Sequence, residues 1–285
     1  MTIKLIQIKD KHSIDEFVAE AKPLCVCDFY VKDSEKAQVR DDHILYDDAL
    51  IIDHHAPIAQ SERQVSSTNM AIDYVRRENP SNLNVLINHT DCDAVLSALI
   101  MARRLEPLDI FGEAAIAADH TGQENEIADL LQALQDARDL DYSERELHKC
   151  LSSAQKDYEP RTVELLEKRK ADRERARSFA NQFQYKGDIA YLQLYKKLDS
   201  ALLPPYLPQA KVILVASPMD NSKLEVKARL GNNCDNIKLN KLDLPDFGGR
   251  WNAGSTKRCG GTSYSLEQYA GIVAQKIANY QEDRK

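Results

Sequence analysis

Residues 50–60 read "LIIDHHAPIAQ" and place three aliphatic residues directly before an aspartate and two histidines. The longer run "ALIIDHH" at 49–55 is apolar up to Asp53, which is typical of a strand covered on both faces. Pro57 then favours a turn soon after the histidines. The segment therefore predicts a buried strand that delivers Asp53, His54 and His55 to the edge of a sheet.

Short aliphatic runs alternate with helical periods on both sides of this segment. The strand-like runs are "IKLIQI" (3–8), "PLCVCDF" (23–29) and "LNVLINH" (83–89), and the helical segments are "SIDEFVAEA" (13–21), "STNMAIDYVRRE" (67–78) and "AVLSALIMARRL" (94–105). Alternation of apolar strands with helices is typical of a parallel sheet in an α/β fold. We expect residues 1–140 to form such a domain.

The rest of the chain predicts a linker and a second, smaller domain. Residues 141–185 are charged and favour helix, as in "RTVELLEKRKADRERARSFANQF" (161–183), which suits either a long exposed helix between two lobes or a helix packed by one narrow stripe. Strand patterns return in "DIAYLQLY" (188–195), "AKVILVASP" (210–218) and "KLEVKARL" (223–230), and "SLEQYAGIVAQKIANY" (265–280) is helical. We expect residues 186–285 to form a small α/β domain.

Composition narrows the class of protein. The 285 residues are 43% hydrophobic and 29% charged, which is typical of a globular chain. A formal net charge of −7 argues against a surface that grips long nucleic acids by general phosphate neutralisation. The sequence contains no run of apolar residues long enough for a membrane span and no apolar core of a signal peptide, so we expect a cytoplasmic protein without membrane contact.

Chemistry-bearing residues follow four runs that we interpret as strands. They are Asp28 after "LCVC", Asp53-His54-His55 after "LII", His89, Asp91 and Asp93 after "NVLIN", and Asp119-His120 after "AAIAA". The carboxyl ends of parallel strands open onto one edge of the sheet, so these side chains can converge there. Taken singly, an aspartate that follows a strand, such as Asp28 or Asp119, is most often a cap or a turn former.

The segment "NHTDCDAVLSAL" (88–99) supplies three of these residues at alternate positions. In an extended conformation the side chains of His89, Asp91 and Asp93 fall on one side of the backbone, where they could hold a divalent ion. The alternative is that Asp93 caps a helix that begins near Ala94. The segment alone leaves both interpretations open.

The two histidines at the end of the central strand predict a division of roles. Successive side chains point to opposite faces of a strand, so we expect one histidine to be a ligand and the other to face the substrate. Asp53 would then orient an imidazole from outside the ligand shell. Mixed histidine and aspartate ligands suit Mn²⁺, and less specifically Mg²⁺, Co²⁺ or Zn²⁺. The five aspartates and the histidines are numerous enough for two ions.

Together, "IIDHHAP" (51–57) and "NHTDCDAVLSAL" resemble the motifs of the DHH phosphoesterases, a family that includes RecJ-type exonucleases, nanoRNA and pAp phosphatases and cyclic dinucleotide phosphodiesterases. The closing segment "KLEVKARLGNNCDNIKLNKLDLPDFGGRWNAGS" (223–255) resembles the C-terminal domain associated with that family. In the family the H-x-D-x-D motif usually precedes DHH, whereas here it follows by about 35 residues. This sequence also has "GGR" where many relatives have a glycine-histidine pair.

The resemblance implies roles for particular residues. It places His89, Asp91 and a bridging Asp28 on one ion, and Asp93, Asp28, His54 and Asp119 on the other. It also implies that His55 faces the phosphate, that Gly248 and Gly249 let the backbone approach the substrate, and that Arg250 holds a phosphate oxygen. The catalytic set would then be His55, Asp53 and Arg250.

We therefore expect a hydrolase that uses two Mn²⁺ ions to cleave phosphoester bonds in nucleotides or short oligonucleotides. The sequence is also compatible with a homodimer. Two alternatives stay open. One is a catalytically silent module of the same fold that binds nucleic acid or a protein, and the other is a pyrophosphatase or polyphosphatase. The full set of ligand-type residues argues against the first, and the loop "GGRWNAG" (248–254) argues against the second.

Overall fold

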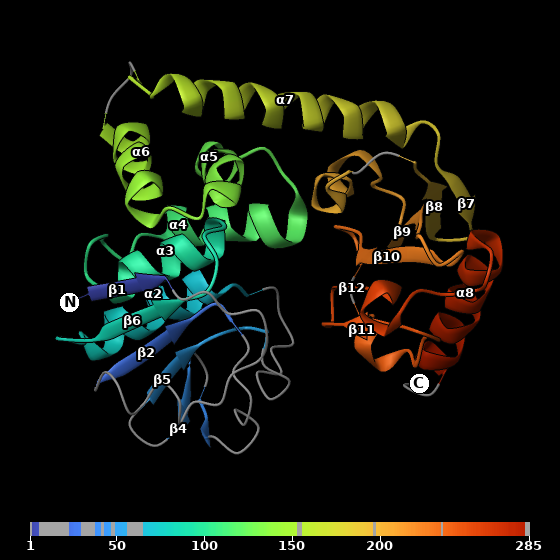
Figure 1. Ribbon diagram of the computed structural model, residues 1–285. Helices are drawn as coiled ribbons and strands as arrows, with labels where there is room; N and C mark the ends of the chain where they lie inside the picture. Colours follow the sequence, from blue (N-terminus) through green and yellow to red (C-terminus); the bar gives the residue numbers. More distant parts are fainter. Residues whose placement is uncertain are drawn as a thin grey trace. The chain divides into compact units, whose positions relative to one another are not determined.

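The computed structural model describes residues 2–5, 23–29, 38–40, 43–46, 49–55, 65–152, 156–195, 198–234 and 236–282. The helix expected at 13–21 lies outside these ranges. The chain divides into two compact units: unit 1 comprises Met1–Asp119 and Glu124–Arg169, and unit 2 comprises His120–Gln123 and Lys170–Lys285. Each unit combines a six-stranded sheet with helices (Figure 1), so the predicted α/β class is confirmed.

The sheet of unit 1 follows the order β1-β6-β2-β5-β4-β3. Its strands are β1 (Thr2–Leu5), β2 (Leu24–Cys27), β3 (Gln38–Val39), β4 (Ile44–Tyr46), β5 (Ala49–Ile52) and β6 (Asn84–Ile87). The four strands β1, β6, β2 and β5 are parallel, as predicted, and β4 and β3 continue the sheet as an antiparallel edge. All residues of β2 and β5 are buried, which explains their continuous apolar sequences.

The register of the parallel strands aligns their carboxyl ends. Cys27 in β2 pairs with Ile52 in β5, and Val26 pairs with Leu86 in β6. The residues that follow β2 and β5, Asp28 and Asp53, therefore leave the sheet at the same edge. This alignment positions the candidate site.

Helices account for most of the remaining described residues of unit 1. They are α2 (Ser67–Glu78), α3 (Cys92–Met101), α4 (Asp109–Ile116), the π-helical turn η2 (Ala117–Thr121), α5 (Glu126–Leu134), the 3-10 turn η3 (Gln135–Ala137), α6 (Leu140–Ser152) and α7 (Pro160–Ala180). Of these, η2 and α7 continue into unit 2, after Asp119 and Arg169 respectively. Helix α3 packs on β6 and β2, while α2 packs on α3 and β5. All ten residues of α3 are buried, which explains why all of them except Asp93 and Ser97 are apolar.

One predicted strand is wrong. The run "AAIAA" at 114–118 ends helix α4 and enters the π-helical turn η2, so Asp119 follows a helix and no strand. Alanine has the highest helix propensity of the residues, and a short apolar run alone does not separate a buried helix from a strand.

Of the described helices, none combines the length and apolar character that a membrane span requires.

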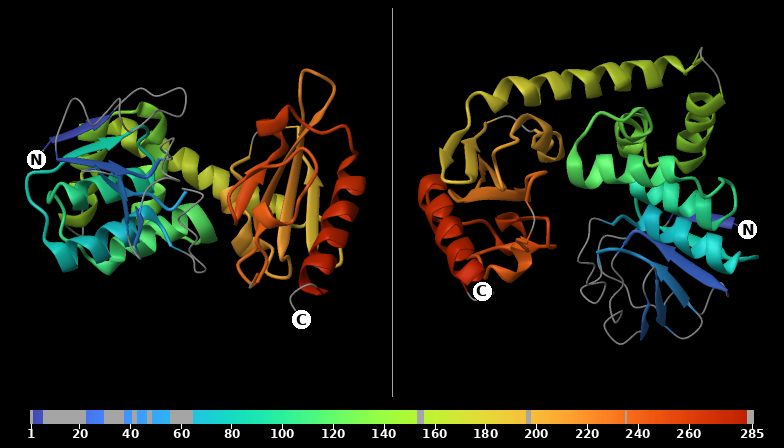
Figure 2. Two further views of the ribbon diagram at one scale, coloured as in Figure 1. Left: turned by 90° about the horizontal axis from the view of Figure 1, so that it is seen from below. Right: turned by 180° about the vertical axis from the view of Figure 1, so that it is seen from behind.

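Unit 2 contains a mixed sheet in the order β11-β12-β10-β9-β8-β7. The C-terminal helix, drawn in red in Figure 2, lies beside this sheet. The elements of this unit are β7 (Gln184–Lys186), β8 (Ile189–Gln193), β9 (Val212–Pro218), β10 (Leu224–Leu230), β11 (Gly248–Gly249), β12 (Ala253–Ser255), α8 (Leu266–Glu282) and the 3-10 turns η4 (Ser200–Leu202), η5 (Pro204–Tyr206), η6 (Leu239–Lys241) and η7 (Thr256–Cys259). Only β8 and β9 pair in parallel among the described strands of this unit.

Alternation along β9 gives unit 2 a core on each face of its sheet. Val212 and Leu214 join the cluster that includes α8, whereas Ile213 and Val215 join the cluster of residues 176–215. This explains why "VILVASP" is apolar over most of its length: both of its faces are covered.

Candidate metal centre

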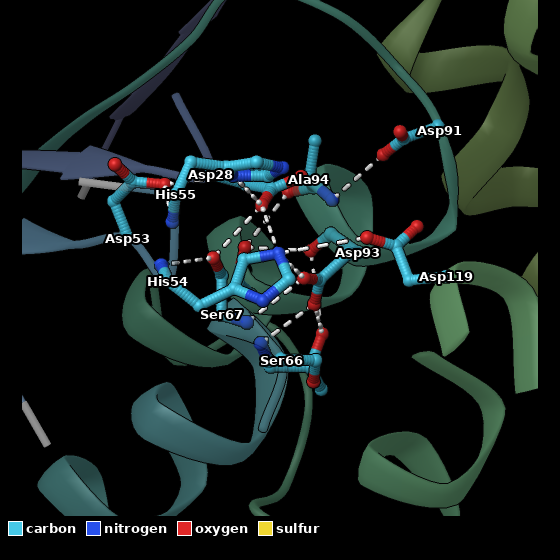
Figure 3. Close-up of polar contacts among 12 residues, drawn as sticks. Asp28, Asp53, His54, His55, Ser66, Ser67, Asp91, Asp93, Ala94 and Asp119 are labelled. Atoms are coloured by element: carbon cyan, nitrogen blue, oxygen red, sulfur yellow. Dashed lines mark hydrogen bonds and ion pairs between the residues drawn. The ribbon is translucent and has the colours of Figure 1, made fainter. Parts of the chain in front are cut away.

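Seven side chains of unit 1 converge where β2, β5 and β6 end (Figure 3). Their ligand-type atoms form three overlapping groups, each within 4.8 Å: Asp28, His54 and His55; Asp28, His89 and Asp91; and His54, Asp93 and Asp119. These seven include all six metal ligands that the sequence predicted. Their role as ligands stays a prediction.

Asp28 is the residue common to the groups around His55 and His89. Its Oδ1 lies 3.6 Å from His54 Nε2 and 3.4 Å from His55 Nδ1, while its Oδ2 lies 3.2 Å from His89 Nε2. The two oxygens of one carboxylate thus face two different groups. That arrangement suits a bridging carboxylate.

The backbone of Asp28 has a φ of 57°, in the left-handed region that aspartate and asparagine tolerate better than most residues. This turn follows directly on β2 and aims the side chain into the cluster. The Asp28 side chain is 1% exposed. Burial and then the neighbouring Asp93 carboxylate raise the pKa of Asp28 well above its usual value.

His54 is held in the orientation of a metal ligand. Its Nδ1 lies 2.7 Å from the Val65 carbonyl oxygen, which can only accept, so Nδ1 carries the proton. In the neutral ring Nε2 then offers its lone pair, and Nε2 lies 3.5 Å from both Asp93 Oδ2 and Asp119 Oδ2. A backbone carbonyl on the other ring nitrogen is a usual partner of a metal-binding histidine.

His55 lies on the same side as His54, contrary to our expectation of opposite faces. The two rings meet edge to face at 4.2 Å between centroids. The reason is that β5 ends at Ile52, so the alternation of a strand no longer applies at 54 and 55. As predicted, Asp53 orients an imidazole, since its Oδ1 accepts from both the His55 amide and His55 Nδ1 at 2.9 Å.

Asp53 is fully buried beneath His55. Burial alone would raise its pKa, but the hydrogen bond from His55 and the charge of that ring lower the pKa of Asp53 below its usual value. Asp53 therefore stays ionised and keeps accepting from His55. The His55 side chain itself is 30% exposed, so it lies on the open side of the cluster.

Residues 91–93 form the start of α3 and do not continue an extended strand. Asp91 is the N-cap of α3 and its Oδ1 accepts from the Ala94 amide at 3.1 Å, while Asp93 lies in the first turn. Asp91 Oδ2 lies 3.3 Å from His89 Nε2, and Asp93 turns instead toward His54. The residue that caps the helix is thus Asp91 rather than Asp93, because the helix begins two residues earlier than expected.

His89 contacts two carboxylates in the metal-free protein. Burial by itself would lower its pKa, but Asp91 and Asp28 outweigh burial and raise the pKa of His89 to about 11. At this pKa the ring carries a proton at neutral pH and balances part of the charge of the two carboxylates. Such a donor set fits a divalent cation, because it combines histidine nitrogens with carboxylate oxygens.

Exposure is graded across the cluster. Asp28, His54 and Asp93 form a buried floor, whereas His89 is 33% and Asp91 22% exposed. A substrate can therefore reach the cluster from the side of His55, His89 and Asp91.

Residues that the sequence analysis missed hold this floor in place. Ser67 and Thr68, at the start of α2, donate to Asp93 and Asp28. A helix-start signal was readable in "SST" at 66–68, but nothing in the sequence indicates which carboxylates it meets.

The predicted substrate loop lies in unit 2, on the hairpin β11–β12. The Arg250 amide donates to the Ala253 carbonyl at 2.8 Å and closes the turn. A Cβ on Gly249 would stand 2.4 Å from the Cα of Gly254, so close packing of the two strands already requires glycine at 249. The substrate contacts of Gly248, Gly249 and Arg250 stay predictions.

Trp251 packs within unit 2. Its ring stacks on His120 with centroids 5.7 Å apart, and it contacts the core cluster beside α8. Asn252 Nδ2 lies 2.8 Å from His120 Nδ1. Asp119 and His120, which are adjacent in sequence, thus belong to different units and serve different partners.

No family model matches the sequence, and no curated protein does. The structure is similar to that of PggH, a pGpG-specific phosphodiesterase from Vibrio cholerae, with 15% identity, 82% of this chain and 81% of that chain covered, and a TM-score of 0.46. It is also similar to exonuclease RecJ bound to manganese (13% identity, TM-score 0.33) and to RecJ from Thermus thermophilus in complex with Mg²⁺ (12% identity, TM-score 0.34).

The matches to RecJ cover 60% and 76% of this chain but only 45% and 34% of the RecJ chains. At these identities and TM-scores, every argument about this chain rests on its own residues and geometry.

Proposed function

We propose that the protein is a metal-dependent phosphoesterase that hydrolyses phosphoester bonds in nucleotides or short oligonucleotides. The observation that carries the proposal is the convergence of four aspartates and three histidines into three overlapping groups. Asp28 and His54 link the groups, since each of them belongs to two. Asp28, His89 and Asp91 would hold one ion, and Asp28, His54, Asp93 and Asp119 the other. When bound, two divalent ions, with Mn²⁺ as our first choice, supply an activated water and stabilise charge on phosphorus.

The chain's own groups would bind and orient the substrate. His55, which Asp53 fixes through Nδ1, stands on the open side of the cluster and can donate to a phosphate oxygen when protonated. Arg250 can offer two parallel N–H donors to a phosphate. The buried floor of Asp28, His54 and Asp93 keeps the ligand geometry fixed while substrates exchange.

The experiment that tests this function also tests substrate size. We expect purified protein with Mn²⁺ to release phosphate or nucleotide from pAp, cyclic dinucleotides or oligonucleotides of a few residues with a higher kcat/KM than from long single strands. The reason is that a net charge of −7 disfavours a long polyanion, and few phosphate contacts give a shallow salt dependence. Rates across a length series at two salt concentrations measure this.

Three results would count against the proposal. Processive digestion of long single-stranded DNA that outpaces dinucleotide cleavage would move the protein toward RecJ-type exonucleases. No release from any of these substrates or from pyrophosphate, despite Mn²⁺ uptake, would favour a silent binding module. Rapid cleavage of pyrophosphate alone would favour the pyrophosphatase alternative.

Replacing Arg250 with Ala should raise KM more than it lowers kcat. An arginine that grips the substrate equally in ground and transition states contributes uniform binding, so its loss weakens binding with little change in turnover. Steady-state kinetics on a short substrate measure the split. Lys276→Ala is the matched control, because Lys276 is a cation of the same unit whose partner is Asp243 on the surface, at 3.1 Å. A fall in kcat with unchanged KM would show that Arg250 acts only in the transition state.

A further inference from the structure

The first turn of helix α2 meets two carboxylates of the candidate metal centre (Figure 3). The amide of Ser67 donates to Asp93 Oδ2 at 2.8 Å, and the amide and hydroxyl of Thr68 donate to Asp93 Oδ1 at 2.7 and 2.6 Å. The hydroxyl of Ser67 donates to Asp28 Oδ1 at 2.8 Å. All four residues are buried.

These donors are available because of where they lie in the helix. The first amides of an α-helix have no intrahelical acceptor, and the N-cap side chain of Ser66 satisfies only the amide of Asn69. The amides of Ser67 and Thr68 remain, and they aim at Asp93. The positive end of the helix dipole adds to their attraction for a carboxylate.

Ser67 also joins residues from three separate elements. Its amide holds Asp93 from α3 and its hydroxyl holds Asp28 from the end of β2. The same hydroxyl oxygen lies 3.4 Å from the donating amide of His54, which follows β5. One small residue therefore fixes the mutual placement of three predicted ligands.

Neutral donors have an advantage here over a lysine or arginine. They orient a carboxylate without cancelling its charge, so the full charge is available to a cation. With both oxygens of Asp93 restrained, the carboxylate needs little rearrangement when an ion binds, and preorganisation of this kind strengthens binding.

We infer that Ser67 and Thr68 are positioning residues of the metal centre, which act through Asp93 and Asp28 and set the affinity for the ions. The inference rests on the proposed function and extends it to residues outside the ligand set. Thr68 serves the group of His54, Asp93 and Asp119 through Asp93. Ser67 serves that group through its amide and the two groups that contain Asp28 through its hydroxyl.

The test is a titration of the full metal-free chain with Mn²⁺ by calorimetry. Thr68→Val keeps the shape and the amide but removes the hydroxyl donor, and we expect about ten- to a hundredfold weaker binding at one of two sites. Thr68→Ser restores the hydroxyl and should bind as the wild type does. Ser67→Ala should weaken both sites and provides a second, independent variant.

The matched control is Asn125→Ala. Asn125 is the N-cap of α5 and its Oδ1 accepts from the Ala128 amide at 3.0 Å, so its loss also weakens a helix start of unit 1. We expect a lower melting temperature with unchanged Mn²⁺ affinity. That separates loss of carboxylate positioning from loss of helix stability.

The outcomes are distinct. Wild-type affinity at both sites in Thr68→Val and in Ser67→Ala would overturn this inference and leave the proposed function standing. Equal weakening of both sites by Thr68→Val and by Asn125→Ala would also overturn it, because general stability would then be the cause. No Mn²⁺ uptake by the wild type would overturn the proposed function and this inference together.

Discussion

The Asp28→Asn variant should lose Mn²⁺-dependent turnover while its metal-free form melts at a higher temperature than the wild type. Asn can accept the hydrogen bond from Ser67 and tolerates the left-handed φ of 57°, so the local fold is preserved. It cannot supply the charge that two groups share. Loss of several kcal/mol of metal-assisted stabilisation corresponds to a fall in kcat on the order of a thousandfold.

The gain in stability follows from the direction in which the pKa of Asp28 departs from its usual value. A folded-state pKa above the unfolded value means that the ionised carboxylate destabilises the fold, and each tenfold change in the acid dissociation constant corresponds to about 1.4 kcal/mol. This destabilisation applies at neutral pH and disappears when the carboxylate is replaced. For a chain of this size, destabilisation by about 1 kcal/mol lowers the Tm by about 2–4 °C.

Activity, Mn²⁺ uptake and thermal melting with and without chelator measure the three parts of this prediction. Asp109→Asn is the control, because Asp109 is an exposed partner of Arg76, and removal of a surface ion pair changes stability little. Retained Mn²⁺ uptake at both sites in Asp28→Asn would contradict the bridging role. A lower Tm of the metal-free variant would contradict the electrostatic argument.

The affinity for Mn²⁺ should rise about tenfold or more for each pH unit, which amounts to about a hundredfold between pH 6 and pH 8. His89 has a pKa of about 11 in the metal-free protein, so a ligating His89 must first release its proton. At a pH below that pKa, each proton that Mn²⁺ displaces makes the affinity rise about tenfold per pH unit. Titrations in buffers of different ionisation enthalpy count the protons released.

The interactions that raise the pKa of His89 also stabilise the metal-free fold. This stabilisation decreases as the pH rises, whereas the affinity for Mn²⁺ increases. Because the folded pKa of His89 lies above the unfolded value, this stabilisation is complete below about pH 6.5 and is lost as the pH rises toward 11. His89→Gln should bind Mn²⁺ more weakly and with a shallower pH dependence. An affinity that does not change with pH in the wild type would show that His89 is not a ligand.

The sequence was sufficient for the parts of the fold that depend on local pattern. Uninterrupted apolar runs predicted β2, β5 and β6, and the period of "STNMAIDYVRRE" predicted α2. Because parallel strands end at one edge, the convergence of Asp28, Asp53 and His89 followed from that pattern.

Other parts of the site depend on contacts that a local pattern does not contain. "AAIAA" is apolar in either a strand or a buried helix, so the π-helical turn that presents Asp119 could not be predicted. The bond from Ser67 to Asp93 spans 26 residues, and the bond from Ser67 to Asp28 spans 39. Only the packing of α2 against α3 and the sheet brings these residues together.

The assignment of His120–Gln123 to unit 2 has a consequence for dissecting the protein. The chain passes between the units three times, after Asp119, after Gln123 and after Arg169, so neither unit is a single continuous stretch. A fragment that starts at residue 170 would lack the Gly122 and Gln123 carbonyls that accept from Arg173. It would also lack the Thr121 carbonyl that accepts from Asn232. Gene fission or domain shuffling at α7 would therefore remove these three hydrogen bonds, and an independent second half must carry its own copy of residues 120–123.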